Sequence, residues 1–305
     1  MTGAGSRAKR GLTALLLLSP ALALLGLVFG YPLVRLVELS TQDVVTYERT
    51  FGVGLDNYRT VWDDPEFHNS LANSGRLLLA VPLLAVLAVL VAAALRERWP
   101  GWQLQRGLIA LLYVLPIPAF ALAMRQVLRG DGLLNGTLDG IGLSFISQPW
   151  LSSAGIAIWS LLVLIVVKEL GLGVLIFSAR LDRVDEQLYQ AARLDGARWW
   201  RQLWHVSLPQ ARDVAGLYVV LAAVTMLSWV FAYVYVLTGG GPANATSVLE
   251  IFLYRRMFGG GSGGQDIGIA AAVGVMMLVA VLAAFALGAA AAAIARTARR
   301  RRAAS

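Results

Sequence analysis

Six long runs of apolar residues alternate with more polar segments along the chain. The runs cover residues 12–37, 77–95, 108–128, 154–178, 214–237 and 267–294. Each run is close to or above the roughly 20 residues that an α-helix needs to cross the hydrocarbon core of a bilayer. The alternation of single apolar and polar residues that is typical of a membrane β-barrel is absent. The pattern predicts an all-α integral membrane protein, with a bundle of six transmembrane helices within residues 12–295.

The composition excludes two other classes of protein. Hydrophobic residues make up 58% of the chain and charged residues 14%, whereas soluble domains average about 45–50% and about 25%. The chain is therefore too apolar for an ordinary soluble domain, and too apolar for a disordered segment. It has no cysteine, so disulfide and thiolate chemistry are excluded.

Basic residues gather in alternate connections and account for the net charge of +8. They precede the first run, lie between the second and third and between the fourth and fifth, and follow the sixth. The positive-inside rule then places both ends, residues 1–11 and the basic tail 296–305, in the cytoplasm. The charge is thus a signal of topology in membrane lipid, and we predict no nucleic-acid partner.

The N-terminus allows two interpretations. Arg7 and Arg10, followed by a leucine run and the small residues Ala21 and Ala23, resemble a secretory signal peptide with its cleavage site. The apolar run continues past Ala23 to Phe29 and beyond, however, and this length favours an uncleaved first span.

The fourth run contains two adjacent charges, Lys168 and Glu169. Two charges at mid-helix cost about 5–7 kcal/mol on the insertion scale, and the aliphatic residues of the run offset about 4.5–9 kcal/mol. The helix is therefore expected to face the interior of the bundle or a watery cavity. Two interpretations remain for Lys168: a residue of the translocation path, or a structural lysine.

The chain lacks the motifs of several kinds of enzyme. Its only lysines, Lys9 and Lys168, lie outside any P-loop frame, so no nucleotide site is predicted. His68 and His205 fall on opposite sides of the predicted membrane and cannot share a metal. The glycine run at residues 261–265 resembles the signature loop of a transporter ATPase, but it has no companion motif and is interpreted as a flexible loop. We therefore predict no catalytic residue, no metal and no cofactor on this chain.

The connection over residues 179–213 is long and amphipathic. Apolar residues recur at helical spacing before and after Asp195 and Gly196, which interrupt the pattern, so two short helices are predicted. Pro209 is expected to close the segment before the fifth span. The segment could be a solvated basic loop, a helix lying on anionic lipid, or a helix that docks in the groove of a partner.

This connection resembles the cytoplasmic EAA loop of importer-type ABC permeases. Gln190-Ala191-Ala192, Asp195-Gly196-Ala197 and Leu208-Pro209 occupy the places of that motif, with glutamine in place of the usual glutamate. The resemblance implies a place in the plasma membrane of a prokaryote. It also implies a second permease, so that the pair is a heterodimer, and two ATPase subunits that hold the ATP and magnesium. It also implies that the residues coupling to the ATPases are Gln190, Ala191, Ala192, Asp195, Gly196, Ala197, Leu203 and Pro209.

Other segments resemble the carbohydrate-uptake branch of these permeases, of the maltose and glycerol-phosphate type. They include residues 54–59, 64–67 and 131–135, and above all the run at 238–246. The resemblance implies a sugar or related small solute delivered by an extracytoplasmic binding protein, and a polyol or glycerophosphodiester remains open. The side facing the binding protein would include Gly240, Gly241, Pro242 and Asn244.

Aromatic residues crowd the fifth run and suggest a path for a sugar. Sugars stack their apolar faces on aromatic rings, and Trp229 and Tyr233 share a helix face because they are one turn apart. With Tyr235 and Lys168 they form the predicted substrate path; the alternative is that the rings pack or face lipid. An ion-coupled secondary transporter would need a membrane carboxylate, for which Glu169 is the evident candidate, and a membrane enzyme would need a catalytic pair that the sequence does not show.

Overall fold

The computed structural model describes residues 17–46, 49–259 and 266–304. It divides into two compact units, the first made of residues 1–64 and 253–305 and the second of residues 65–252. The predicted N-terminal tail, residues 1–11, and the glycine loop at 261–265 lie outside the described residues. The units are called the terminal unit and the central unit below, and each is described by itself.

Two long helices dominate the terminal unit. The first covers Leu17–Ser40 and includes a π-helical turn, η1 (Gly26–Gly30), before α2 (Tyr31–Ser40). The second, α14 (Ile267–Ala304), packs along α2 and against the short helix α3 (Asp56–Asp63). Both long helices lie where apolar runs were predicted.

A small β-hairpin in the terminal unit corrects the prediction of a purely helical protein. Strand β1 (Gln42–Thr46) pairs antiparallel with β2 (Arg49–Gly52). The start of α14 lies so close to β1 that a Cβ on Gly268 would clash with the carbonyl oxygen of Gln42. Such short strands have too few apolar positions to be recognised from the sequence, because the contact that supports them comes from a helix more than 200 residues later.

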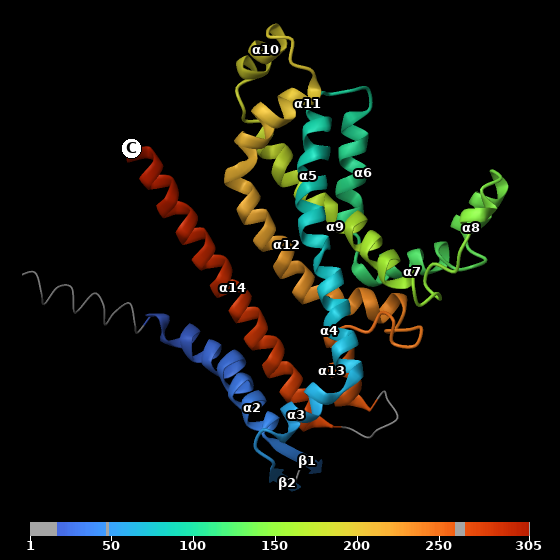
Figure 1. Cartoon of the computed structure of the whole chain (residues 1–305), viewed down its shortest axis with the longest axis vertical. Coiled ribbons are helices and arrows are strands. Elements are labelled where there is room, and N and C mark those ends of the chain that lie inside the picture. Colours follow the sequence, from blue (N-terminus) through green and yellow to red (C-terminus); the bar gives the residue numbers. More distant parts are fainter. Residues whose placement is uncertain (1–16, 47–48, 260–265, 305) are drawn as a thin grey trace, which may run out of the picture. The chain divides into compact units, whose positions relative to one another are not determined.

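The central unit is a bundle built around one helix, α9 (Ala157–Leu181) (Figure 1). It packs against α5, α6 and α12. Gly173 makes the close packing possible, because a Cβ there would clash with Ala88 of α5 and the ring of Tyr218 of α12. The helices around it are α4 (Pro65–Leu78), α5 (Ala80–Arg96), α6 (Trp102–Val114), α7 (Ile117–Val127) and α12 (Leu208–Leu237).

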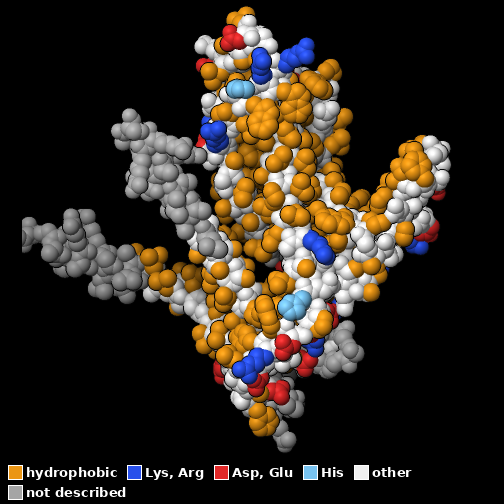
Figure 2. All heavy atoms as spheres, in the orientation of Figure 1, with side chains coloured by type: hydrophobic (Ala, Val, Ile, Leu, Met, Phe, Trp, Pro, Cys, Tyr) orange, Lys and Arg blue, Asp and Glu red, His pale blue; other side chains and the backbone are white. Residues whose placement is uncertain are grey.

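The outer surface of this bundle is largely apolar, as lipid contact requires. Figure 2 shows apolar side chains covering the face of the long helices, and charged side chains at the end of the bundle where α10 (Glu186–Leu194) lies. Leu104, Leu108 and Leu111 of α6 are exposed at the spacing of one helical face. Exposed leucines along one face of a helix indicate a surface that is covered by lipid or by another membrane helix.

Five described helices are long and apolar enough to cross a membrane, and a bent pair would bring the number to six. The bent pair corrects the prediction of a continuous helix over residues 108–128. Helix α6 ends at Val114, α7 begins at Ile117, and their axes differ by 106°. Pro116 at the break has no N–H to donate to the preceding turn, and the residue before a proline disfavours helical geometry.

Two further boundaries differ from the predictions. Helices α4 and α5 together cover Pro65–Arg96, so residues 65–67, expected in an outside loop, begin a helix. The fifth span begins early as well: α11 (Trp199–Gln202), the π-turn η3 (Leu203–Ser207) and α12 form one helical stretch, and Pro209 lies inside it rather than closing a loop. The wider π-turn accommodates the missing N–H and the ring of the proline.

Candidate coupling and translocation sites

A short helix, α10 (Glu186–Leu194), occupies the connection between α9 and α11. Asp185 caps its first turn, because its carboxylate accepts a hydrogen bond of 2.9 Å from the backbone N–H of Gln187. The helix ends before Gly196, whose φ of +72° is in the left-handed region that glycine adopts without strain. Asp185 therefore has a structural role as the N-cap of α10.

Half of the predicted coupling residues lie on one exposed surface. We define the α10 surface as Leu188, Gln190, Ala191, Leu194, Asp195 and Gly196, all of which are exposed. Leu194 is 90% exposed, an unusual degree for a leucine. Of the other predicted residues, Ala192, Ala197 and Pro209 are half-buried, and Leu203 is fully buried in the core. Leu203 therefore packs against this chain and is not free to contact a partner.

Arg96, at the end of α5, holds α10 against the bundle. Its guanidinium lies 2.7 Å from the carboxylate of Glu186 at the start of α10 and 3.9 Å from the ring centroid of Tyr189. It also donates to the carbonyl oxygen of Leu181, the last residue of α9. One side chain thus joins three helices. The sequence showed Arg96 only as one of the charges that set topology, so this role was missed.

A second contact joins α10 to the fifth span. The buried hydroxyl of Tyr189 lies 3.0 Å from the hydroxyl of Ser207, in the π-turn before α12. Arg180 of α9 and Asp213 of α12 form an ion pair of 2.9 Å at the same end of the bundle. Paired side chains therefore connect α10 to α5, α9 and α12.

We expect Arg96→Ala to loosen α10 without unfolding the bundle. The loss of a charge-assisted hydrogen bond and a ring contact, about 1–3 kcal/mol, is expected to speed amide hydrogen exchange in residues 186–194 by about tenfold or more. Arg98→Ala is the matched control, because the guanidinium of Arg98 lies over the ring of Trp102 in α6, 5.8 Å from its centroid, whereas that of Arg96 contacts Glu186 and Tyr189 of α10. Equal exchange rates in α10 of the two variants would contradict the anchoring role.

The charged pair of the fourth run is buried among three helices. Lys168 and Glu169 of α9 lie 3.3 Å apart, and Lys168 also donates a bond of 3.2 Å to the carbonyl oxygen of Tyr113 in the last turn of α6. That carbonyl is one of those that the end of a helix leaves without a partner, and a cation is favourable there. The hydroxyl of Tyr233 on α12 donates to Glu169.

The structure brings together only part of the predicted substrate path. Tyr233 is fully buried and is linked to Lys168 through Glu169. Trp229 and Tyr235 are 54% and 48% exposed on the surface of this chain, and Tyr235 stacks on Phe231 with the ring centroids 5.3 Å apart. Trp229 and Tyr233 are one turn apart, as expected, but the neighbouring helices cover only Tyr233.

The loop after α12 is fixed in place by the polar face of α4. The Asn69 side chain donates to the carbonyl oxygen of Asn244 at 2.6 Å, and buried Asn73 donates to those of Ala245 and Ser247, both at 3.0 Å. Of the residues predicted to face the binding protein, Gly240 is buried, and Gly241, Pro242 and Asn244 are half-buried. The two asparagines were missed from the sequence, although their i, i+4 spacing was a possible signal.

Comparisons with known proteins agree with this architecture. The family model described as "Binding-protein-dependent transport system inner membrane component" matches residues 76–301. A probable ABC transporter permease protein of Brucella suis is 31% identical, over 86% of this chain and 90% of that protein. The lactose transport system permease protein LacF of Rhizobium radiobacter is 29% identical, over 80% of this chain and 82% of its own.

A solved structure has the same fold. It is a chain of a bacterial alginate ABC transporter in complex with an alginate pentasaccharide-bound periplasmic protein. The TM-score is 0.77 at 20% identity, covering 93% of this chain and 94% of that one. The chain therefore belongs to the family of binding-protein-dependent transport system inner membrane components. It is a multi-pass membrane permease of a binding-protein-dependent importer.

Proposed function

We propose that this chain forms one half of the translocation pathway of an ATP-driven sugar importer. The observation that carries the proposal is the exposed α10 surface, which stands at one end of an otherwise apolar bundle and leaves leucines without partners in this chain. A soluble subunit that docks there would bury Leu188 and Leu194. The proposed occupants are two ATPase subunits, which hold the ATP and magnesium, one on this permease and one on a second permease.

The mechanism is mechanical. Both termini and the α10 surface face the cytoplasm in the proposed orientation, which rests on the placement of the basic residues. Closure of the ATPases moves α10, and the contacts of Arg96 and Tyr189 transmit this movement to α5, α9 and α12. The bundle then changes between inward-open and outward-open states. Helix α10 is the element through which the state of the ATPase and the state of the solute path influence each other.

The solute is proposed to be a sugar or a related small polar molecule. The names of relatives support this class, since LacF belongs to a lactose system, and the alginate transporter was solved in complex with a periplasmic protein that holds an alginate pentasaccharide. Trp229 and Tyr235 remain exposed in this chain, and a second permease would enclose them in a shared cavity where rings can stack on a sugar. Tyr233 and Lys168 support that wall from behind rather than lining it.

Reconstitution tests this function. A sister permease, an ATPase and a binding protein are sought in the neighbouring reading frames and placed with this chain in proteoliposomes. Uptake of a radiolabelled oligosaccharide that the binding protein binds is then measured. We expect uptake that requires ATP and the binding protein and that resists a protonophore. Uptake without ATP that collapses with a protonophore would instead show an ion-coupled secondary transporter, with Glu169 as the candidate carboxylate.

A further inference from the structure

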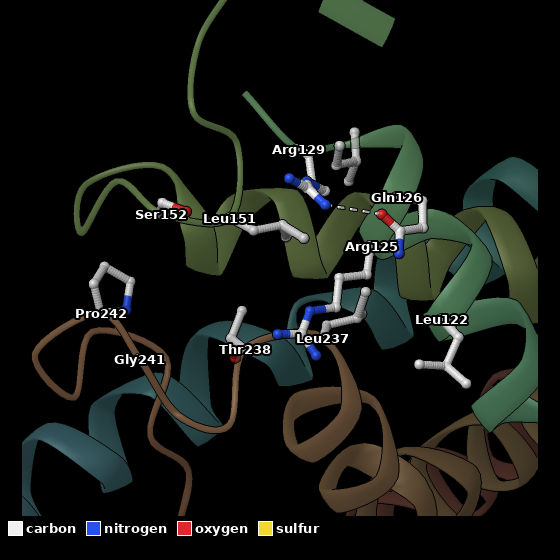
Figure 3. A pocket seen from close by; sticks show the side chains of 11 residues that line it. Leu122, Arg125, Gln126, Arg129, Leu151, Ser152, Leu237, Thr238, Gly241 and Pro242 are labelled. Carbon is white, nitrogen blue, oxygen red and sulfur yellow. Dashed lines mark hydrogen bonds between the residues drawn. The ribbon is translucent and has the colours of Figure 1, made fainter. Parts of the chain in front are cut away.

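A pocket of about 770 Å³ opens beside the loop that follows α12, within the central unit. Its walls come from α7, from the segment after Trp150 and from the end of α12 with its loop (Figure 3). The volume lies in the range of about 300–1,000 Å³ that small-molecule sites occupy. Its polar lining residues are Arg125, Gln126, Arg129, Ser152 and Thr238, and no acidic residue lines it.

Of the two arginines in this pocket, one is paired with a carboxylate and the other is not. Arg129 forms a two-pronged ion pair with Asp131, with N–O distances of 3.0 and 3.2 Å, so its charge is neutralised. Arg125 has no ion pair within the described part of the chain, and in Figure 3 its guanidinium reaches from α7 toward Leu237 and Thr238. The pocket therefore holds one uncompensated positive charge, with the hydroxyl of Ser152 and the amide of Gln126 on its walls.

The position of Arg125 argues against a role in topology. The pocket lies at the end of the bundle away from α10, which is the outer side in the proposed orientation, where the positive-inside rule disfavours arginine. The walls are also braced: buried Asn135 accepts a bond of 2.8 Å from the indole of Trp150 and donates to the carbonyl oxygens of Gly130 and Gln148. A braced polar pocket with an uncompensated cation is suited to a small anion.

We infer that this pocket binds the carboxylate of an acidic saccharide through Arg125, with Ser152 and Gln126 bonding its hydroxyls. This deepens the proposed function, on which it rests, by assigning the solute an acid group. A guanidinium binds a carboxylate with two parallel hydrogen bonds, and Arg125, Gln126 and Ser152 are all exposed to an incoming solute. The pocket forms an outer site that the solute meets before the membrane cavity.

Direct binding to the purified full chain tests this assignment. The chain is kept in an uncharged polyoxyethylene detergent, and digalacturonate and neutral galactobiose, which differ by two carboxylates, are titrated by calorimetry. We expect digalacturonate to bind at least about tenfold more tightly, since a charge-assisted hydrogen bond contributes enough for that ratio. Arg125→Gln should remove the preference, and Arg125→Lys should keep most of it.

Two controls make the result decisive. Arg59→Gln removes another exposed outer arginine, far along the chain from the pocket lining, and should leave binding unchanged. Phosphocholine is added as a competitor, because an arginine near the interface can also bind lipid phosphate. Equal binding of the two saccharides, unchanged binding by Arg125→Gln, or full displacement by phosphocholine would each overturn the inference. ATP-driven uptake of a neutral sugar alone would overturn it as well, while leaving the importer function intact.

Discussion

Replacing Gly196 with arginine is expected to abolish ATP-driven uptake and to remove the stimulation of the ATPase by loaded binding protein. Gly196 has a φ of +72°, and a Cβ at this position would meet no atom of this chain within 4 Å. The space beside it is therefore available to a partner. A large cation placed there would obstruct docking on the α10 surface. The loss of one central contact costs about 2 kcal/mol or more of binding free energy, which lowers the affinity of the ATPase for this surface by about 30-fold or more.

The matched control is Gly196→Asn, which separates the backbone from the interface. Asparagine tolerates left-handed geometry better than other side chains and adds little volume. We expect this variant to keep most of the uptake, measured in the same proteoliposomes with the same amount of complex. Full uptake by Gly196→Arg would show that no partner approaches this position, and the proposed coupling site would then be wrong.

The largest effect on stability is expected from Lys168→Met. The substitution leaves the carboxylate of Glu169 buried without its cation and leaves the carbonyl of Tyr113 without its donor. Breaking a buried pair by removing one partner typically costs about 3–5 kcal/mol. The midpoint of thermal unfolding in detergent should therefore fall markedly, and α6 should lose its fixed position against α9.

Two further variants decide between charge imbalance and loss of packing. Lys168→Met combined with Glu169→Gln removes both charges and should recover much of the loss, because the uncompensated carboxylate is gone. Val167→Met changes a neighbour that is exposed on the surface of α9 and should have an effect within about 0.5 kcal/mol on the free energy of unfolding. An unfolding midpoint of Lys168→Met equal to that of the parent would contradict a structural role for the pair.

These contacts bear on the two interpretations of Lys168. Both of its hydrogen bonds end within the chain, on Glu169 and on the helix end at Tyr113, and the side chain is buried. They favour a lysine that holds a broken helix in place over one that contacts solute. The break at Pro116 and the lysine belong together, since the proline frees carbonyl groups of α6 and the lysine satisfies one of them.

Prediction from the sequence succeeded where the signal is a sum over many residues. The apolar runs that became α9 and α12 were recognised because each side chain contributes to the transfer into lipid nearly independently of its neighbours. The turn at Gly196 was recognised because glycine is the residue that such a turn needs. The bend at Pro116 was missed because proline within a membrane helix is compatible with either a kink or a break, depending on what packs beside it.

The sequence by itself determined the order of the apolar segments, the bias of basic residues toward alternate connections, and the motif on which the proposed coupling connection rests. Only the tertiary structure decided which charges meet. Lys168 donates to the carbonyl oxygen of Tyr113, which is 55 residues away in the sequence. Glu169 accepts a hydrogen bond from Tyr233, which is 64 residues away. Such pairs depend on which helix faces pack together, and a local pattern of hydrophobicity contains no information about distance between segments. For the same reason the sequence did not show that Arg96 joins three helices, or that Arg125 remains uncompensated in a pocket.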